Sequence, residues 1–249
     1  MMLQIRRSVP QETALRYLSR AMPDAGVGSN LLAGVPLPRD NFFTPQCFHR
    51  GDESDDSGFY KQPRFVTHID DGAIGALTRH YEAVLPSKAT AHLDVCSSWV
   101  SFLPDSYRPP RCVGLGMNQA ELDRNQQLTE TVVQDLNKNP KLPFEDESFD
   151  AVTNVVSIDY MTNPLELLAE YRRVLRPGGI AVHSFSNRMF WTKAVAIWTA
   201  GDEWQRVLIA SAYFSIAGFD QVEAFMVRSP KDGDPLYVVQ ARKGAKSEL

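Results

Sequence analysis

From about Ile69 to the end of the chain, short apolar runs alternate with segments of helical spacing. This alternation limits the possible folds more than any other feature. In the first helical segment, apolar residues recur at three- and four-residue spacing from Ala73 to Leu85, and Pro86 ends it. The predicted strands are residues 92–96, 112–115, 130–134, 149–157, 180–185, 221–227 and 236–241. Strands separated by helices need right-handed crossovers, so the pattern predicts a doubly wound, mostly parallel sheet of seven strands.

Only the turn 229–235 separates the last two predicted strands. Because so short a connection joins antiparallel neighbours, the last strand is expected to run against the others. Further helices are predicted at 118–125, 164–175 and 203–217, and the second is expected to stop at Pro177-Gly178-Gly179. The expected fold class is therefore α/β, with an antiparallel last strand.

Residues 22–64 show no apolar period, because glycines and prolines interrupt them repeatedly. They also contain the acidic stretch 51–58. A loop of this length in a compact domain is typically a lid or a mobile linker. The sequence thus predicts two parts, an irregular N-terminal extension or lid at 1–64 and an α/β domain at 65–249.

Composition excludes several classes of partner. The 249 residues carry a net charge of −4 and no basic tract longer than Arg6-Arg7, so no nucleic-acid partner is expected. No apolar run approaches the roughly 18 residues of a membrane span, so no stable membrane insertion is expected. Cys47, Cys96 and Cys112 lack CxxC spacing, which favours a reducing compartment over a disulfide framework.

The first twenty residues leave localisation open. Arg6, Arg7, Arg16 and Arg20 face a single acid, Glu12, among serines and threonines. This composition fits a mitochondrial or plastid transit peptide, and it equally fits an ordinary amphipathic helix at 10–21 in a cytoplasmic protein.

Three other chemistries lack their sequence patterns. The five histidines show no metal-ligand repeat, so no metal site is predicted. The stretch Cys96-Ser97-Ser98-Trp99 is not the G-x-S-x-G turn of a serine hydrolase. A dinucleotide oxidoreductase would need G-x-G-x-x-G after its first strand, and the chain has none there.

Two segments carry a family resemblance that covers about residues 69–242. Residues 142–152 read LPFEDESFDAV, and residues 165–179 end in EYRRVLRPGG. At this separation they resemble the class I S-adenosylmethionine-dependent methyltransferases, of the type 11 kind. The resemblance implies a Rossmann-like sheet, S-adenosylmethionine as cofactor, and transfer of its methyl group to a small-molecule acceptor.

Ligands of open α/β sheets bind beyond the carboxyl ends of the strands, near the point where strand order reverses. The resemblance places the cofactor there, on Asp94, Cys96, Ser97, Ser98, Gly116, Met117, Asn118, Asp135, Leu136 and Ser157. It also implies that Asp135 accepts from the adenine amino group. The alternative for Asp135 is an Asx cap of the turn 136–140.

Two departures from the family pattern concern this site. The loop 94–100 has no glycine, although serine hydroxyls could replace some contacts to the cofactor carboxylate. Gly116 stands where the family has the acid that binds the ribose, and Asn118 or Glu121 could replace that acid. Trp99 either stacks in the pocket or packs under the sheet, and tryptophan frequencies favour packing.

The acceptor side is predicted from polar residues near the cleft. Candidate general bases are Asp159, Tyr160 and His183. Candidate substrate residues are Tyr60, Arg64, His68, Asn187 and Arg188. Among these, Arg64 and His68 could anchor an anionic substrate or the cofactor carboxylate.

The sequence leaves two functions open: a methyltransferase, or a methyltransferase-like fold that acts as a binding or assembly protein. The oligomeric state stays open.

Overall fold

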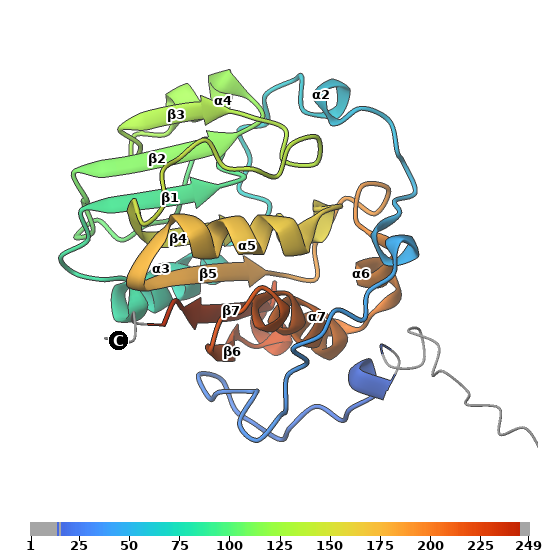
Figure 1. The fold of residues 1–249 in the computed structure, drawn as a ribbon. Coiled ribbons are helices and arrows are strands. Elements are labelled where there is room, and N and C mark those ends of the chain that lie inside the picture. Colours follow the sequence, from blue (N-terminus) through green and yellow to red (C-terminus); the bar gives the residue numbers. More distant parts are fainter. Residues whose placement is uncertain (1–13, 15, 245–249) are drawn as a thin grey trace, which may run out of the picture.

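The computed structural model describes Ala14 and residues 16–244. Its centre is one sheet in the order β3-β2-β1-β4-β5-β7-β6 (Figure 1). The strands are β1 (Ala91–Val95), β2 (Arg111–Gly116), β3 (Glu130–Val133), β4 (Phe149–Val155), β5 (Leu175–Phe185), β6 (Gln221–Arg228) and β7 (Leu236–Arg242). Strand β7 pairs antiparallel with both β5 and β6, and the other pairs are parallel. The predicted fold class, including the antiparallel last strand, is confirmed.

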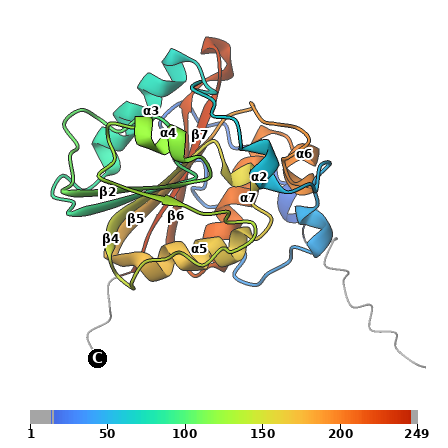
Figure 2. The same ribbon diagram turned by 90° about the horizontal axis from the view of Figure 1, so that it is seen from above.

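The helices cover the two faces of this sheet. They are α2 (Asp56–Phe59), α3 (Asp71–Val84), α4 (Gln119–Arg124), α5 (Pro164–Val174), α6 (Ala196–Ala200) and α7 (Glu203–Ile216), with short 3-10 turns at Pro45–Phe48, Ile158–Tyr160 and Pro230–Asp232. Figure 2 shows α3 on one face and α5 with α7 on the other. Each face has its own apolar cluster, because Leu77 and Tyr81 of α3 pack on one side and Leu168 of α5 and Phe214 of α7 on the other.

The predicted alternation of strands and helices is incomplete. In the described chain, the connections from β1 to β2 and from β3 to β4 contain no helix. Phe102, Leu103 and Tyr107 of the first connection fill the space beside α3 instead. A loop can therefore complete a parallel crossover when its own apolar residues cover the sheet.

Strand β5 begins at Leu175, five residues before the predicted strand at 180–185. Leu175 pairs with Phe149, and the register then shifts before Ala151 pairs with Ile180. The helix predicted at 164–175 is confirmed within one residue, but the strand begins before Pro177-Gly178-Gly179 and not after it. The helix ends at Val174, and the glycines lie in the irregular start of the strand, where Gly178 has a φ of +79°.

The N-terminal segment has little secondary structure, but it packs closely on the rest of the molecule. Asn30 forms a bridge with Phe225 of β6, and Arg50 forms one with Val195. Leu31 and Phe43 are buried in the same cluster as α5 and α7. In Figure 1 the segment runs along the α7 side of the molecule before α2 reaches the carboxyl ends of the strands. A division of the chain at residue 64 stays a prediction.

Most of the residues behind the transit-peptide hypothesis lie outside the described part of the chain, and so does the start of the helix predicted at 10–21. The described residues 16–18 of that helix are helical. Among residues 16–244, no helix combines the length and hydrophobicity needed to cross a membrane. Within the same range, no three His, Cys, Asp or Glu side chains are grouped so that they could hold a metal ion.

Candidate cofactor and acceptor site

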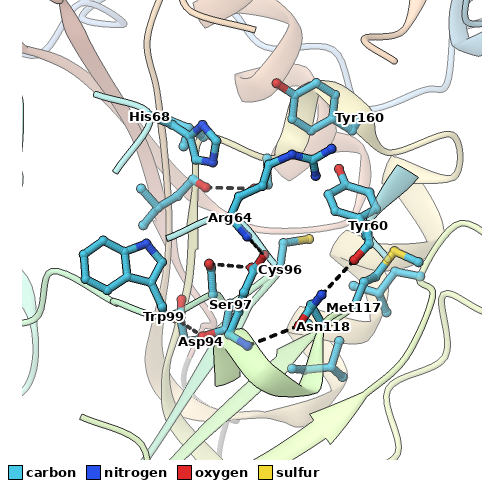
Figure 3. Close-up of a pocket in the computed structure, with 18 of the residues that line it drawn as sticks. Tyr60, Arg64, His68, Asp94, Cys96, Ser97, Trp99, Met117, Asn118 and Tyr160 are labelled. Atoms are coloured by element: carbon cyan, nitrogen blue, oxygen red, sulfur yellow. Dashed lines mark hydrogen bonds between the residues drawn. The ribbon is translucent and has the colours of Figure 1, made fainter. Parts of the chain in front are cut away.

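A cavity of about 340 Å³ opens at the carboxyl ends of the parallel strands (Figure 3). Its volume falls in the range of small-molecule sites. One side, here called the sheet wall, consists of lining residues within 94–102, 115–121, 134–137 and 155–161. The opposite side, the segment wall, consists of lining residues within 56–68. All ten residues that the sequence assigned to the cofactor line this cavity: Asp94, Cys96, Ser97, Ser98, Gly116, Met117, Asn118, Asp135, Leu136 and Ser157.

The loop after β1 makes the turn of a glycine-rich loop without glycine. Cys96, at the first glycine position of the family pattern, has a φ of 57°. A side chain in this left-handed conformation costs about 1–2 kcal/mol. The backbone N–H of Ser97 then donates to the carbonyl of Leu115 at 2.8 Å, which holds the loop against β2. The turn is therefore kept, at the cost of backbone strain.

The loop after β1 lies directly against Gly116. A Cβ atom on Gly116 would overlap the carbonyl oxygen of Ser97. With the loop on this path, an acidic side chain at position 116 would collide with the backbone of Ser97. Gly116 is the residue that the altered path of the loop requires.

Asp94 is buried under this loop and accepts three hydroxyl hydrogen bonds. Its donors are Ser97 Oγ at 2.6 Å, Ser101 Oγ at 2.7 Å and Thr153 Oγ1 at 3.1 Å. Burial raises the pKa of Asp94 to about 6, while the three hydroxyls oppose that rise. The hydroxyl of Ser98 donates to Glu121 at 2.7 Å. Both serine protons are thus committed to protein carboxylates, so the expectation that they contact the cofactor carboxylate lacks support.

Glu121 and Asn118 join the two walls. One oxygen of Glu121 accepts from Ser98, and the other accepts from the backbone N–H of Arg64 at 2.7 Å. Asn118 caps α4 and donates to the carbonyls of Tyr60 at 2.9 Å and Lys61 at 3.2 Å. Both residues suggested as replacements for the ribose acid line the cavity.

Asp135 lines the cavity and also makes the alternative Asx turn. Its Oδ1 accepts from the backbone N–H groups of Asn137 at 3.0 Å and Lys138 at 3.3 Å. Asn137 in turn donates to Asp56 at 2.9 Å and to the carbonyl of Tyr160 at 3.0 Å. The cap orients the Asp135 carboxylate and leaves it at the cavity.

A buried ion network anchors the segment wall. The Asp56 carboxylate lies 2.7 Å from Arg50 Nη1 and 3.1 Å from Lys193 Nζ, with the three side chains 4%, 7% and 1% exposed, respectively. Burial opposes the charge of Asp56, but the bonds from Arg50, Asn137 and Lys193 keep its pKa below the usual value. Two cations thus hold one carboxylate where water does not screen them.

Trp99 lines the cavity, so the favoured interpretation that it packs under the sheet is wrong. Its Nε1–H donates to the carbonyl of Val66 at 2.9 Å, and its ring meets Phe65 edge-on with centroids 6.4 Å apart. The indole therefore connects the altered loop to the segment wall.

The predicted bases are not all at the cavity. Tyr160 lines it, but burial raises the pKa of its hydroxyl, which accepts from the backbone N–H of Phe190 at 2.9 Å. Asp159 is buried outside the lining, and burial raises its pKa to about 8. His183 has no exposed surface and packs against Tyr171 and Phe214; burial lowers its pKa to about 3. The suggestion that His183 acts as a base fails because solvent and substrate cannot reach it.

Four of the five predicted substrate residues line the cavity: Tyr60, Arg64, His68 and Arg188. Asn187 does not; its amide lies 3.4 Å from Glu203. Arg188 is paired with Asp234 at 3.0 Å.

The sequence did not single out several lining residues, among them Asp56, Gln134, Asn137, Met189 and Phe190. Asn137 could have been predicted, because it lies within the Asx turn proposed for Asp135. No feature of the sequence indicated Asp56, because its partners Asn137 and Lys193 are distant along the chain.

Backbone strain also marks the cavity. Five described non-glycine residues have positive φ, and four of them line it: His68, Cys96, Phe102 and Val156. Conformations of this kind cluster at functional sites.

Comparison with known proteins agrees with this geometry. A family model described as "Methyltransferase domain" matches residues 96–183. The bifunctional biotin biosynthesis protein BioHC of Teredinibacter turnerae is 36% identical over 75 residues, which are 28% of this chain and 13% of that protein. The chain thus matches only a small share of that relative's length.

Solved structures show the same fold at low identity. A Haloferax volcanii complex of the Trm112 methyltransferase activator with a putative methyltransferase matches at TM-score 0.52 and 16% identity, over 72% of this chain and 93% of that one. A Pyrococcus horikoshii protein matches at TM-score 0.52 and 17% identity, over 75% and 98%. A putative methyltransferase of Bacillus halodurans matches at TM-score 0.50 and 14% identity, over 70% and 100%.

The fold and the cavity define an open α/β protein whose cavity lies beyond the carboxyl ends of its strands, where such sheets place their ligand sites. Residues 96–183 match a methyltransferase domain of the S-adenosylmethionine-dependent kind, whose methyl donor is S-adenosylmethionine.

Proposed function

We propose that this protein transfers the methyl group of S-adenosylmethionine to a small-molecule acceptor inside the cavity. The observation that carries the proposal is the single cavity formed by all ten cofactor residues, with the turn after β1 kept at Cys96. S-adenosylmethionine supplies an electrophilic methyl group on a sulfonium.

The residues present fit such a cofactor. Besides Asp56, which Arg50 and Lys193 neutralise, the carboxylates of Asp94, Glu121 and Asp135 line the cavity, against the guanidinium groups of Arg64 and Arg188. This excess of negative charge suits a ligand that carries an ammonium and a sulfonium. Asp94 and the loop 96–98 would hold the amino-acid part, Asn118 and Glu121 the ribose, and Asp135 with Leu136 the adenine.

The protein's own contribution would be alignment and exclusion of water. The segment wall closes the cavity opposite the strands, so the acceptor and the cofactor would meet in a fixed geometry. Where the acceptor must lose a proton, His68 can receive it. This side chain lines the cavity, and burial lowers its pKa, so it is neutral at pH 7.

We propose that the N-terminal extension acts as a lid through its part within 56–68, which forms the segment wall. Lids of this kind sequester a reaction from water. Limited trypsin digestion tests this role. S-adenosylhomocysteine, the demethylated product, should slow cleavage after the exposed Lys61 at least several-fold. Unchanged cleavage would remove the lid from the proposal.

A second function deserves a test because the carbonyl of Ser97 occupies the place of the family's ribose acid. On that alternative, the protein is a methyltransferase fold that binds or assembles without transferring methyl groups. Calorimetric titration with S-adenosylhomocysteine separates the two. Micromolar binding that Asp94→Ala abolishes supports the enzyme, and no binding at millimolar ligand excludes it.

A further inference from the structure

Arg64 is a cavity-lining cation that has no ion-pair partner among residues 16–244. Its Nη2 donates to the carbonyl of Phe59 at 2.9 Å, and its Nε and Nη1 donate to no described residue. Two other cations at this end of the molecule differ from it. Arg188 is paired with Asp234, and Lys193 with Asp52 and Asp56.

The carboxylates of the cavity are already committed elsewhere. Asp56 is held by two cations, and Asp94 by three hydroxyls. Glu121 accepts from Ser98 and from the backbone of Arg64, not from its side chain. Asp135 caps its own turn and lies 3.7 Å from Lys138. Within the described part of the chain, no carboxylate is therefore placed to neutralise the guanidinium of Arg64.

Arg64 is nevertheless held firmly. Its Cζ lies 4.4 Å from the ring centroid of Phe59 and 5.6 Å from that of Phe190. Cation–π contacts of this kind stabilise a guanidinium in place. With the Arg64 backbone fixed on Glu121, the second N–H of Nη2 stays beside the N–H groups of Nε and Nη1. Nη2 with either neighbour forms the planar pair of donors that binds a carboxylate by two hydrogen bonds.

Aromatic rings surround this group. Tyr160 and Phe190 line the cavity with ring centroids 5.8 Å apart, and Tyr60 lines it beside them. Figure 3 shows the Arg64 guanidinium between Tyr60 and Tyr160, away from Asp94 and Trp99. The cation thus points away from the loop after β1, where the amino-acid part of the cofactor would lie.

On the basis of the proposed function, we infer that Arg64 binds a carboxylate of the methyl acceptor and that this carboxylate is attached to a planar ring. Arg64 would select an anionic aromatic acceptor over its neutral analogue. The same carboxylate chemistry is present in the cofactor, so the experiment must distinguish these two sources.

The probes are benzoate and benzamide, which share a planar ring and differ in charge. Binding is measured by calorimetry or NMR titration to the full chain, with and without S-adenosylhomocysteine. The wild type should bind benzoate at least tenfold more tightly than benzamide. Arg64→Met should remove this preference and leave S-adenosylhomocysteine affinity within about twofold. The control is Arg172→Met, which removes an exposed arginine of α5 outside the cavity. It should keep both the benzoate preference and the wild-type affinity for S-adenosylhomocysteine.

Three outcomes would overturn the inference. They are equal binding of the two probes by the wild type, a benzoate preference that survives Arg64→Met, and a tenfold loss of S-adenosylhomocysteine affinity in Arg64→Met. The last would assign Arg64 to the cofactor carboxylate. If S-adenosylhomocysteine does not bind the wild type, the proposed function fails, while the benzoate comparison without it still decides the role of Arg64.

Discussion

The sheet wall and the segment wall face each other across one cavity, but different forces hold them. The sheet wall consists of strand ends and the turns that follow them, so backbone pairing between β1, β2 and β4 fixes it. The segment wall has almost no regular structure. Long-range polar contacts position it, chiefly those of Asp56 with Lys193 and Asn137 and the bonds that Glu121 and Asn118 make to residues 60–64.

This difference shows how a shared fold can acquire its own site. The sheet wall keeps the position of the cofactor site even where its loop is altered. The segment wall brings the residues that would choose the acceptor, Tyr60, Arg64 and His68. Variation in such segments can change specificity without changing the sheet.

The largest effect is expected where the segment wall is anchored. Asp56→Ala removes the carboxylate that Arg50 and Lys193 share and leaves them Glu53 at 3.6 Å and Asp52 at 3.2 Å, respectively. This should cost about 3 kcal/mol of unfolding free energy, the lower end of what breaking a buried ion pair costs. Chemical denaturation measures this cost. Asp105→Ala breaks only the exposed pair with Arg108 and should cost less than about 1 kcal/mol. Equal effects of the two substitutions would mean that the buried network does not anchor the segment.

On the sheet wall, Gly116→Asp restores the family's acid and should still impair the protein. The new side chain would overlap the Ser97 carbonyl, a form of overpacking that costs about 1–3 kcal/mol. Denaturation and calorimetry should show lower stability and weaker S-adenosylhomocysteine binding. Gly26→Asp is the control, since a Cβ there meets no atom within 4 Å. Tighter binding by Gly116→Asp would show that the loop can move aside.

Glu121→Gln tests the connection between the walls. Glutamine has the shape of the Glu121 side chain, but its NH₂ group replaces one of the two accepting oxygens. That NH₂ group then faces another donor, either Ser98 Oγ or the backbone N–H of Arg64. We expect S-adenosylhomocysteine affinity to fall about tenfold, equivalent to about 1.4 kcal/mol, and trypsin to cut faster after Lys61. Glu82→Gln, on the exposed side of α3, should change neither. Unaltered affinity in Glu121→Gln would remove Glu121 from the proposed ribose site.

The smallest effect is a pH dependence on the sheet wall. Burial raises the pKa of Asp94 to about 6, so the folded protein binds this proton more readily than the unfolded chain does. Relative to Asp94→Asn, the wild type should therefore gain stability as pH falls through about 6 and lose it as pH rises.

Ligand binding should show the opposite sign. The ionised Asp94 favours an ammonium, so S-adenosylhomocysteine affinity should fall roughly three- to tenfold between about pH 7.5 and pH 5. Calorimetry at several pH values measures this, with Asp94→Asn as the variant that should lack the dependence. A pH profile shared by both proteins would point to another group.

Much of the sheet wall could be predicted, because its information is local. The apolar runs and the segments 142–152 and 165–179 located the strands, and the strand ends located Asp94, Gly116, Asp135 and Ser157. Predictions failed where distant contacts intervened. Trp99 is held by Val66 of the segment wall, and His183 lies on a strand covered by α5 and α7.

The sequence by itself determined the fold class, the antiparallel last strand, and which residues follow each strand. These depend on the period of apolar residues and on neighbours along the chain. Only the tertiary structure decided that Ser97 occupies the space beside Gly116 and that Asp56 joins Arg50 and Lys193. It also decided that Arg64 lines the cavity with no ion-pair partner among the described residues. Each depends on groups brought together across the chain, and local periodicity carries no record of such contacts.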